Sequence, residues 1–170
     1  SINQLIIGGI LFLCIWINID DVFSLLPLKF SFGKWVVLFI GLAQLFSMSS
    51  GVNGAIIVNS SYYKYDLVTN ILLVFITLLT NYIFIPIYGI NGAAMATALS
   101  VFLFNFMRLM LIKVKMKMQP FSLKTIYTII LLFIIYFLSS YLPLIGNVYF
   151  DIIWKSSFVI MVFIPLMLFL

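Results

Sequence analysis

Polar side chains that could contact a ligand gather on one helical face in the first third of the chain. Gln44, Ser47, Gly51 and Gly54 recur at three- and four-residue steps, so a helix places them on one face with Asn53 beside them. Small and polar residues on an apolar helix either pack against another helix through hydrogen bonds or line a wet cavity. The sequence leaves both interpretations open for this face.

Two later apolar stretches carry sparser polar residues. Asn70, Thr77 and Asn81 follow seven- and four-residue steps and predict a polar stripe facing the stretch that holds Gln44, unless Thr77 bonds to its own helix backbone. Arg108 lies about one turn from the end of its apolar run, so its guanidinium either extends to lipid phosphates or points inward and attracts an anionic head group. The candidate substrate-path residues are Gln44, Ser47, Asn53, Asn70, Asn81 and Arg108.

The chain is poor in residues that perform acid–base or metal chemistry. It contains no His, and its four acidic residues are all Asp, at Asp20, Asp21, Asp66 and Asp151. The adjacent pair Asp20 and Asp21 would point in different directions on a helix, and a solvated loop is the simplest setting for them and for Asp66. Cys14 has no partner for an internal disulfide. These patterns predict neither a catalytic residue nor a metal site nor a cofactor.

Composition places the chain in a membrane. Of its 170 residues 65% are hydrophobic and 8% charged, and the mean hydropathy of +1.30 is too high for a water-soluble domain. A bilayer core of about 30 Å needs about 20 apolar residues in a helix, because unpaired backbone groups are not tolerated in lipid. The sequence therefore predicts an all-α polytopic bundle in one domain, with six spans at residues 2–19, 35–58, 67–85, 90–112, 125–142 and 152–170.

Loop charge predicts the orientation of these spans. The net charge is +5, and Arg108, Lys113, Lys115, Lys117 and Lys124 surround one connection that holds no acid. The positive-inside rule places that connection in the cytoplasm, which leaves both ends of the chain cytoplasmic in a multi-pass protein of the inner (plasma) membrane. The cluster predicts contact with anionic membrane lipids and is too compact for a nucleic-acid interface.

A tight hairpin is predicted between the third and fourth spans. Pro86 lacks a backbone N–H and Gly89 can adopt positive φ, so the turn at 85–91 ends one helix, and Asn91 can cap the next. Small residues then follow at four-residue spacing, at Gly92, Ala96 and Ser100. This spacing predicts close approach of a neighbouring helix.

The residues of this hairpin also carry a resemblance. The run NYIFIPIYGINGAAMAT at 81–97 resembles a hairpin that recurs in polysaccharide (O-antigen type) flippases of the multidrug/oligosaccharidyl-lipid/polysaccharide exporter superfamily. The segment 34–65, with Gly51, Asn53 and Gly54, is similar to the preceding span and loop of that family. Together these segments cover more than a quarter of the chain.

The resemblance implies a transporter that moves a lipid-linked oligosaccharide, for example in lipopolysaccharide biosynthesis, by alternating access between two lobes. It also implies that this chain, which begins at Ser1 without Met, is the later part of a longer transporter, the last six of about fourteen helices, with the remaining lobe as its partner. A multidrug antiporter of the same superfamily, a membrane-embedded glycosyl- or acyltransferase and a noncatalytic assembly subunit are the alternatives. No Asp lies in the middle of a predicted span, which disfavours the antiporter.

Overall fold

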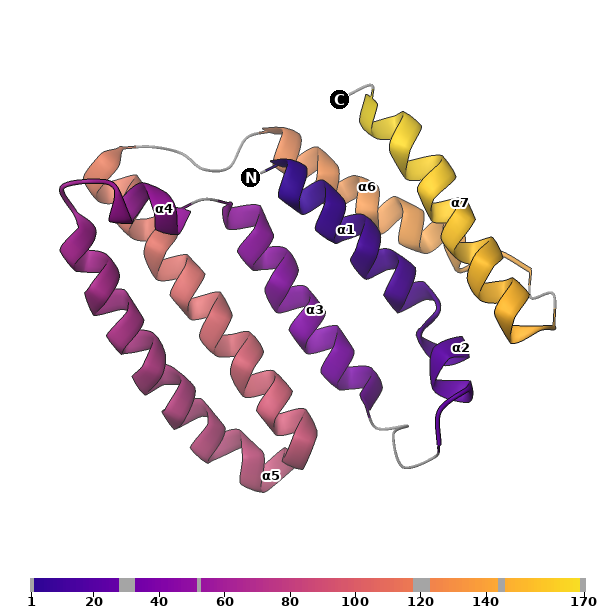
Figure 1. The fold of residues 1–170 in the computed structure, drawn as a ribbon, viewed down its shortest axis with the longest axis horizontal. Helices are drawn as coiled ribbons and strands as arrows, with labels where there is room; N and C mark the ends of the chain where they lie inside the picture. Colours follow the sequence, from indigo (N-terminus) through magenta and orange to yellow (C-terminus); the bar gives the residue numbers. More distant parts are fainter. Residues whose placement is uncertain (1, 28–32, 52, 118–122, 144–145, 169–170) are drawn as a thin grey trace.

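All regular structure in the described part of the chain is helical, as the composition predicted. The computed structural model describes residues 2–27, 33–51, 53–117, 123–143 and 146–168 (Figure 1). Its elements are α1 (Ile2–Ile17), α2 (Ile19–Ser24), α3 (Gly33–Ser50), α4 (Asn53–Val58), α5 (Tyr63–Leu111), the π-helix η2 (Ile112–Met116), α6 (Leu123–Ser139) and α7 (Val148–Leu168).

Two helices among the described residues are long and apolar enough to cross a membrane. They are α3, Gly33–Ser50, and the continuous segment Tyr63–Met116 formed by α5 and η2. The helices Ile2–Ile17 and Lys124–Ser139 are apolar but shorter. The described part of the chain thus contains two helices that could cross a membrane, and it does not show the six separate spans that the sequence predicted.

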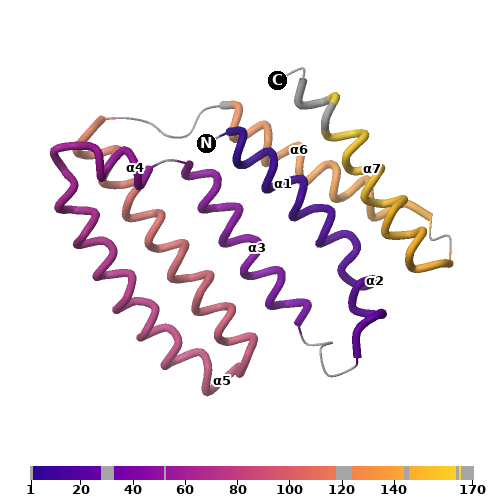
Figure 2. The backbone as a smooth tube through the Cα atoms, in the orientation of Figure 1, coloured from indigo at the N-terminus to yellow at the C-terminus, as the bar shows by residue number. Residues whose placement is uncertain are grey.

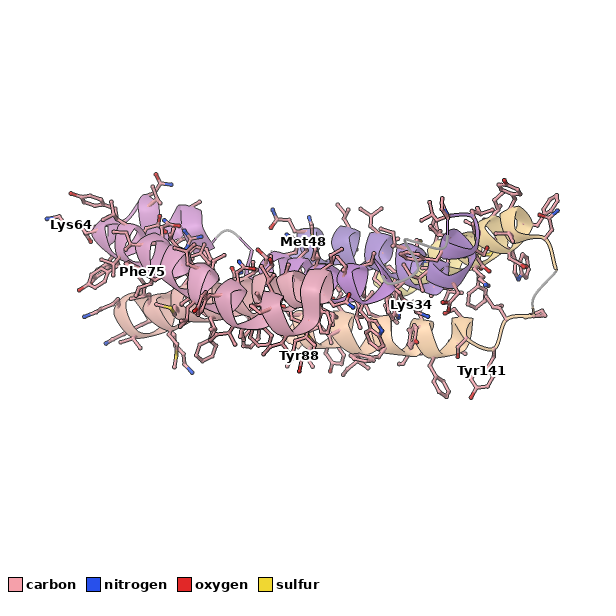
Figure 3. The ribbon with its side chains drawn as sticks, turned by 90° about the horizontal axis from the view of Figure 1, so that it is seen from below. Lys34, Met48, Lys64, Phe75, Tyr88 and Tyr141 are labelled. Carbon is pink, nitrogen blue, oxygen red and sulfur yellow. The ribbon has the colours of Figure 1, made fainter. Side chains whose placement is uncertain are left out.

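The helices form a flat slab in which most lie side by side and α6 lies behind α1 (Figure 1). Figure 2 shows the two arms of α5 at one side, followed by α3, α1 and α7, and Figure 3 shows how thin the slab is when viewed from below. The start of α1, the end of α7, α4, the start of α5 and η2 lie along one edge of the slab, which we call the basic edge because of its lysines (Figure 1). The bend of α5, the start of α3 and α2 lie along the opposite edge.

The 49 residues of α5 form two arms that reverse at Gly89. A straight helix of that length would extend about 74 Å, but Gly89 adopts φ 57° and ψ −130°, a conformation that residues with a Cβ rarely take. The predicted turn at 85–91 was too wide, because the first arm continues as helix through Pro86. The predicted capping by Asn91 is not observed, since the buried Oδ1 of Asn91 has no hydrogen-bond partner.

Small residues allow the two arms to touch. A Cβ on Gly92 would overlap the backbone carbonyl of Phe84, and Ala96 is fully buried. The hydroxyls of Thr80 and Ser100 lie 3.0 Å apart and form a hydrogen bond between the arms. Each hydroxyl has a single proton, so when one of them donates to the other, the accepting hydroxyl donates to a carbonyl of its own helix turn, Ile76 for Thr80 or Ala96 for Ser100.

Two predicted spans are interrupted. The first, predicted at 2–19, breaks at Asn18, where α1 gives way to the short helix α2. The second, predicted at 35–58, breaks after Ser50 because Gly51 takes φ 65°, and α4 then begins at Asn53. The break at Gly51 matters for the site, because it turns α4 away from the axis of α3 and toward the ends of α5 (Figure 1).

A small apolar core joins α1, α6 and α7. Its buried members are Leu13, Leu132, Ile135, Val159 and Phe163. Gly9 lies against Leu132, so the absence of a Cβ at this position brings α1 and α6 close together. Much of the remaining surface of α6 is exposed and apolar, including Phe133 and Phe137.

Candidate functional site

An ion pair between the two arms of α5 forms the centre of the candidate site. Arg108 Nη2 donates to Asp66 Oδ1 at 2.5 Å, and the side chains are only 18% and 15% exposed. Asp66 lies in the first turn of α5 and Arg108 in its last turn, and the reversal at Gly89 brings these two ends together at the basic edge. Asp66 is therefore not the solvated surface charge that its neighbourhood in the sequence predicted.

Three further groups fix the pair. Asn70 Nδ2 donates to Asp66 Oδ2 at 2.9 Å, so both carboxylate oxygens accept a hydrogen bond. The Phe104 ring centroid lies 4.1 Å from Arg108 Cζ, which is a cation–π contact. A Cβ on Gly54 would lie 2.8 Å from Arg108 Nη1, so the glycine of α4 leaves the space that the guanidinium occupies.

Two buried donors, one in the ion pair and one on α4, have no acceptor in the described part of the chain. Arg108 Nε and Asn53 Nδ2 are both buried and lack a hydrogen-bond partner, and Asn53 is 4% exposed. Buried donors without an acceptor carry a desolvation cost of about 1–3 kcal/mol each. An oxyanion that accepted a hydrogen bond from Arg108 Nε would recover the cost of that donor. The arrangement favours binding of an anionic group over covalent chemistry.

An open groove adjoins the ion pair along the first α5 arm and the end of α4. It has a volume of about 500 Å³ and an almost entirely apolar lining, with Asp66 and Asn70 as its polar members. The other lining residues are Val58, Tyr63, Leu67, Ile71 and Val74. A ligand in the groove would place an apolar part against these side chains and a polar part near Asp66.

The polar face predicted on α3 opens into a second groove. Gln44 is exposed, and Ser47 and Gly51 line a groove of about 320 Å³ with Gln4 and Gly8 of α1. Met48, labelled in Figure 3, lines the same groove. Part of the face predicted from Gln44, Ser47 and Gly51 therefore borders open space, whereas Gly54 belongs to the Arg108 site.

The predicted stripe of Asn70, Thr77 and Asn81 does not face α3. In Figure 1 the second arm of α5 lies between the first arm and α3, and the ring contact of Phe46 with Phe102 joins α3 to that second arm. Asn70 is exposed and bonds to Asp66, whereas Asn81 Nδ2 donates to the Thr77 carbonyl of its own helix. The side chains of the stripe therefore do not form a common surface toward the polar face of α3.

Sequence reasoning missed a second polar cluster at the opposite edge. Lys155 Nζ donates to Asp21 Oδ2 at 2.6 Å, and the side chains are 11% and 18% exposed. Asn18, at the break between α1 and α2, donates to Ser156 Oγ at 2.9 Å. Asp21 is thus held against α7 and is not part of a solvated loop. Lys155 inside an apolar run was the signal that could have indicated a buried partner.

The described residues offer no set of three His, Cys, Asp or Glu side chains that could hold a metal ion. Comparisons with protein-family models, with curated proteins and with solved structures found no match to this chain.

Proposed function

We propose that this chain forms one lobe of a membrane transporter that moves a lipid-linked oligosaccharide between the leaflets of the bilayer by alternating access. The observation that carries the proposal is the enclosed Arg108 guanidinium, which has a buried Nε without an acceptor. A cation kept within an apolar helical hairpin is costly unless it has a partner or a function. Here Asp66 is the partner, and an anionic head group would be the ligand.

The chemistry of the substrate fits this site. A lipid-linked sugar carries a phosphate group between its apolar tail and its polar glycan, and Arg binds phosphate through two parallel hydrogen bonds. If Asp66 were released, Arg108 could bind such a phosphate by donating hydrogen bonds from Nε and one Nη nitrogen. Asn70, which already donates to Asp66 Oδ2, would retain the carboxylate after that release.

The surroundings suit an amphiphilic substrate. The groove beside Asp66 is nearly all apolar, and α6 presents exposed Phe133 and Phe137, so tail contacts are available on the lipid side. Gln4 and Ser47 border a separate, more polar groove that suits glycan hydroxyls, and Gln44 is exposed on the same helix as Ser47. Alternating access requires a second lobe, and we infer that the polar groove of α1 and α3 faces it.

The test is disruption of the gene, followed by complementation with variants of the full-length protein. We expect lipid-linked oligosaccharide to accumulate on the cytoplasmic side after disruption. Wild type and Lys34→Gln should restore export, whereas Arg108→Gln should not, and Arg108→Lys should restore it only partly because Lys lacks the planar fork. Each variant is quantified in the membrane fraction, so that loss of protein is separated from loss of transport.

Two outcomes would refute the proposal. Sensitivity to drugs without accumulation of the precursor would indicate an antiporter. Loss of the precursor itself would indicate an enzyme of its synthesis.

A further inference from the structure

The segment Tyr63–Met116 ends in an unusual turn that carries three lysines. Residues Ile112–Met116 form a π-helix, and Lys117 follows with φ 54° and ψ 25°, a left-handed conformation that few residues with a Cβ adopt. Ile112 is buried, whereas Lys113, Lys115 and Lys117 are exposed. The turn therefore anchors itself through an apolar side chain and presents its ammonium groups outward.

A pair of tyrosines from the start of α5 completes this surface. Lys115 Nζ lies 5.8 Å from the centroid of the Tyr65 ring, and the rings of Tyr62 and Tyr65 lie 6.0 Å apart. These tyrosines, Lys115 and Met116 line a small niche together with Ile57 and Leu111. We call Tyr65, Lys113, Lys115 and Lys117 the π-turn cluster.

Nearby carboxylates do not neutralise the π-turn cluster. Asp66 follows Tyr65 directly in the sequence, but its oxygens accept hydrogen bonds from Arg108 and Asn70. The other described Asp residues, at positions 20, 21 and 151, belong to α2 and the start of α7, at other edges of the slab (Figure 1). The three ammonium groups are therefore available to an external anion.

The position of the cluster indicates what that anion is. The π-turn cluster lies at the end of an apolar segment long enough to cross a bilayer, where lipid head groups are found. Val114, between two of the lysines, is 68% exposed, so the surface also offers an apolar contact. Tyrosine rings and lysines are the side chains favoured at this depth.

We propose that the π-turn cluster binds the phosphate of an anionic phospholipid, with Lys115 and the Tyr65 ring at its centre. A free phosphate ion would use the lysines but not Val114 or the tyrosine rings. The proposal requires only that this end of α5 reaches the membrane surface, and it is independent of what the protein transports.

The experiment is native mass spectrometry of the delipidated full-length protein, titrated with phosphatidylglycerol or with phosphatidylcholine. We expect tighter binding of the first phosphatidylglycerol molecule, and a loss of about 5-fold in affinity for each lysine replaced by Gln, because each basic residue near an anionic surface contributes on that scale. Lys34→Gln, at the opposite edge, is the matched control and should leave the affinity unchanged. Tyr65→Leu should weaken binding, whereas Tyr65→Phe, which keeps the ring, should not.

Equal affinity for the two lipids would overturn the proposal. So would equal losses for Lys115→Gln and Lys34→Gln, because these would indicate a general effect of net charge. Inorganic phosphate that competes with phosphatidylglycerol at millimolar concentration would show that the cluster binds a free anion instead of a lipid. All four residues of the π-turn cluster are exposed, and thermal unfolding in the same detergent checks that the variants are folded.

Discussion

The ion pair between the arms of α5 should stabilise the fold far more than an exposed pair of the same geometry. Arg108–Asp66 and Lys34–Asp20 both have an N–O distance of 2.5 Å, but the side chains of the first pair are 18% and 15% exposed and those of the second 36% and 78%. Exposed pairs contribute about 0.2–1 kcal/mol, whereas breaking a buried pair costs about 3–5 kcal/mol. The Arg108–Asp66 pair lies between these limits, and we expect a coupling energy of about 2 kcal/mol, about 30-fold in the ratio of folded to unfolded protein.

The assay is a pair of double-mutant cycles measured by reversible unfolding in mixed micelles. One cycle uses Asp66→Asn, Arg108→Gln and the double variant, and the other uses Asp20→Asn, Lys34→Gln and the double variant. The cycle removes effects that each substitution has alone, such as the loss of the Phe104 contact of Arg108. Equal coupling energies in the two cycles would refute the reasoning, because geometry alone would then determine the contribution.

Further predictions concern the hairpin and the lipid contacts. Gly89→Ala should lower the free energy of unfolding by about 1–3 kcal/mol because of its positive φ, as measured in the same micelles. Gly92→Ala should lower it by about 1–3 kcal/mol, since its Cβ would overlap a carbonyl of the first arm; no loss would contradict the tight packing. Cysteines at positions 88 and 115 should react with an impermeant maleimide from opposite sides of the membrane. A lipid photoprobe should label Phe133 more strongly than other lipid-facing positions, and equal labelling would remove the tail-binding role of α6.

Long apolar runs were enough to predict that the chain is helical, because in a membrane the backbone must satisfy its own hydrogen bonds, but they did not predict where the helices break. Pro86 and Gly89 together located the hairpin in the sequence. They could not show which of the two reverses the chain, because a helix can also continue through a proline, as it does here at Pro86. The breaks at Asn18 and Gly51 depend on one residue each within long apolar runs. Local sequence carries too weak a signal for either.

The side-chain pairs were harder to predict, because they depend on the order of the helices in the slab. Arg108 meets Asp66 only after α5 reverses, and Lys155 meets Asp21 only because α7 packs beside α2. The partners in each pair are far apart in the sequence, and no spacing rule connects them. Asn70 was predicted as a candidate, but its role beside Asp66 could be assigned only after the ion pair was seen.

The most direct test of the central claim is transport by the purified full-length protein in vesicles. A labelled lipid-linked oligosaccharide is incorporated, and its appearance in the opposite leaflet is followed with an impermeant reagent that oxidises the glycan. We predict time-dependent translocation by the wild type and a rate about tenfold or more lower with Arg108→Gln, since a charge-assisted contact contributes about 1.5–3 kcal/mol. A wild-type rate equal to that of protein-free vesicles would contradict transport, and an unchanged rate with Arg108→Gln would contradict the proposed head-group site.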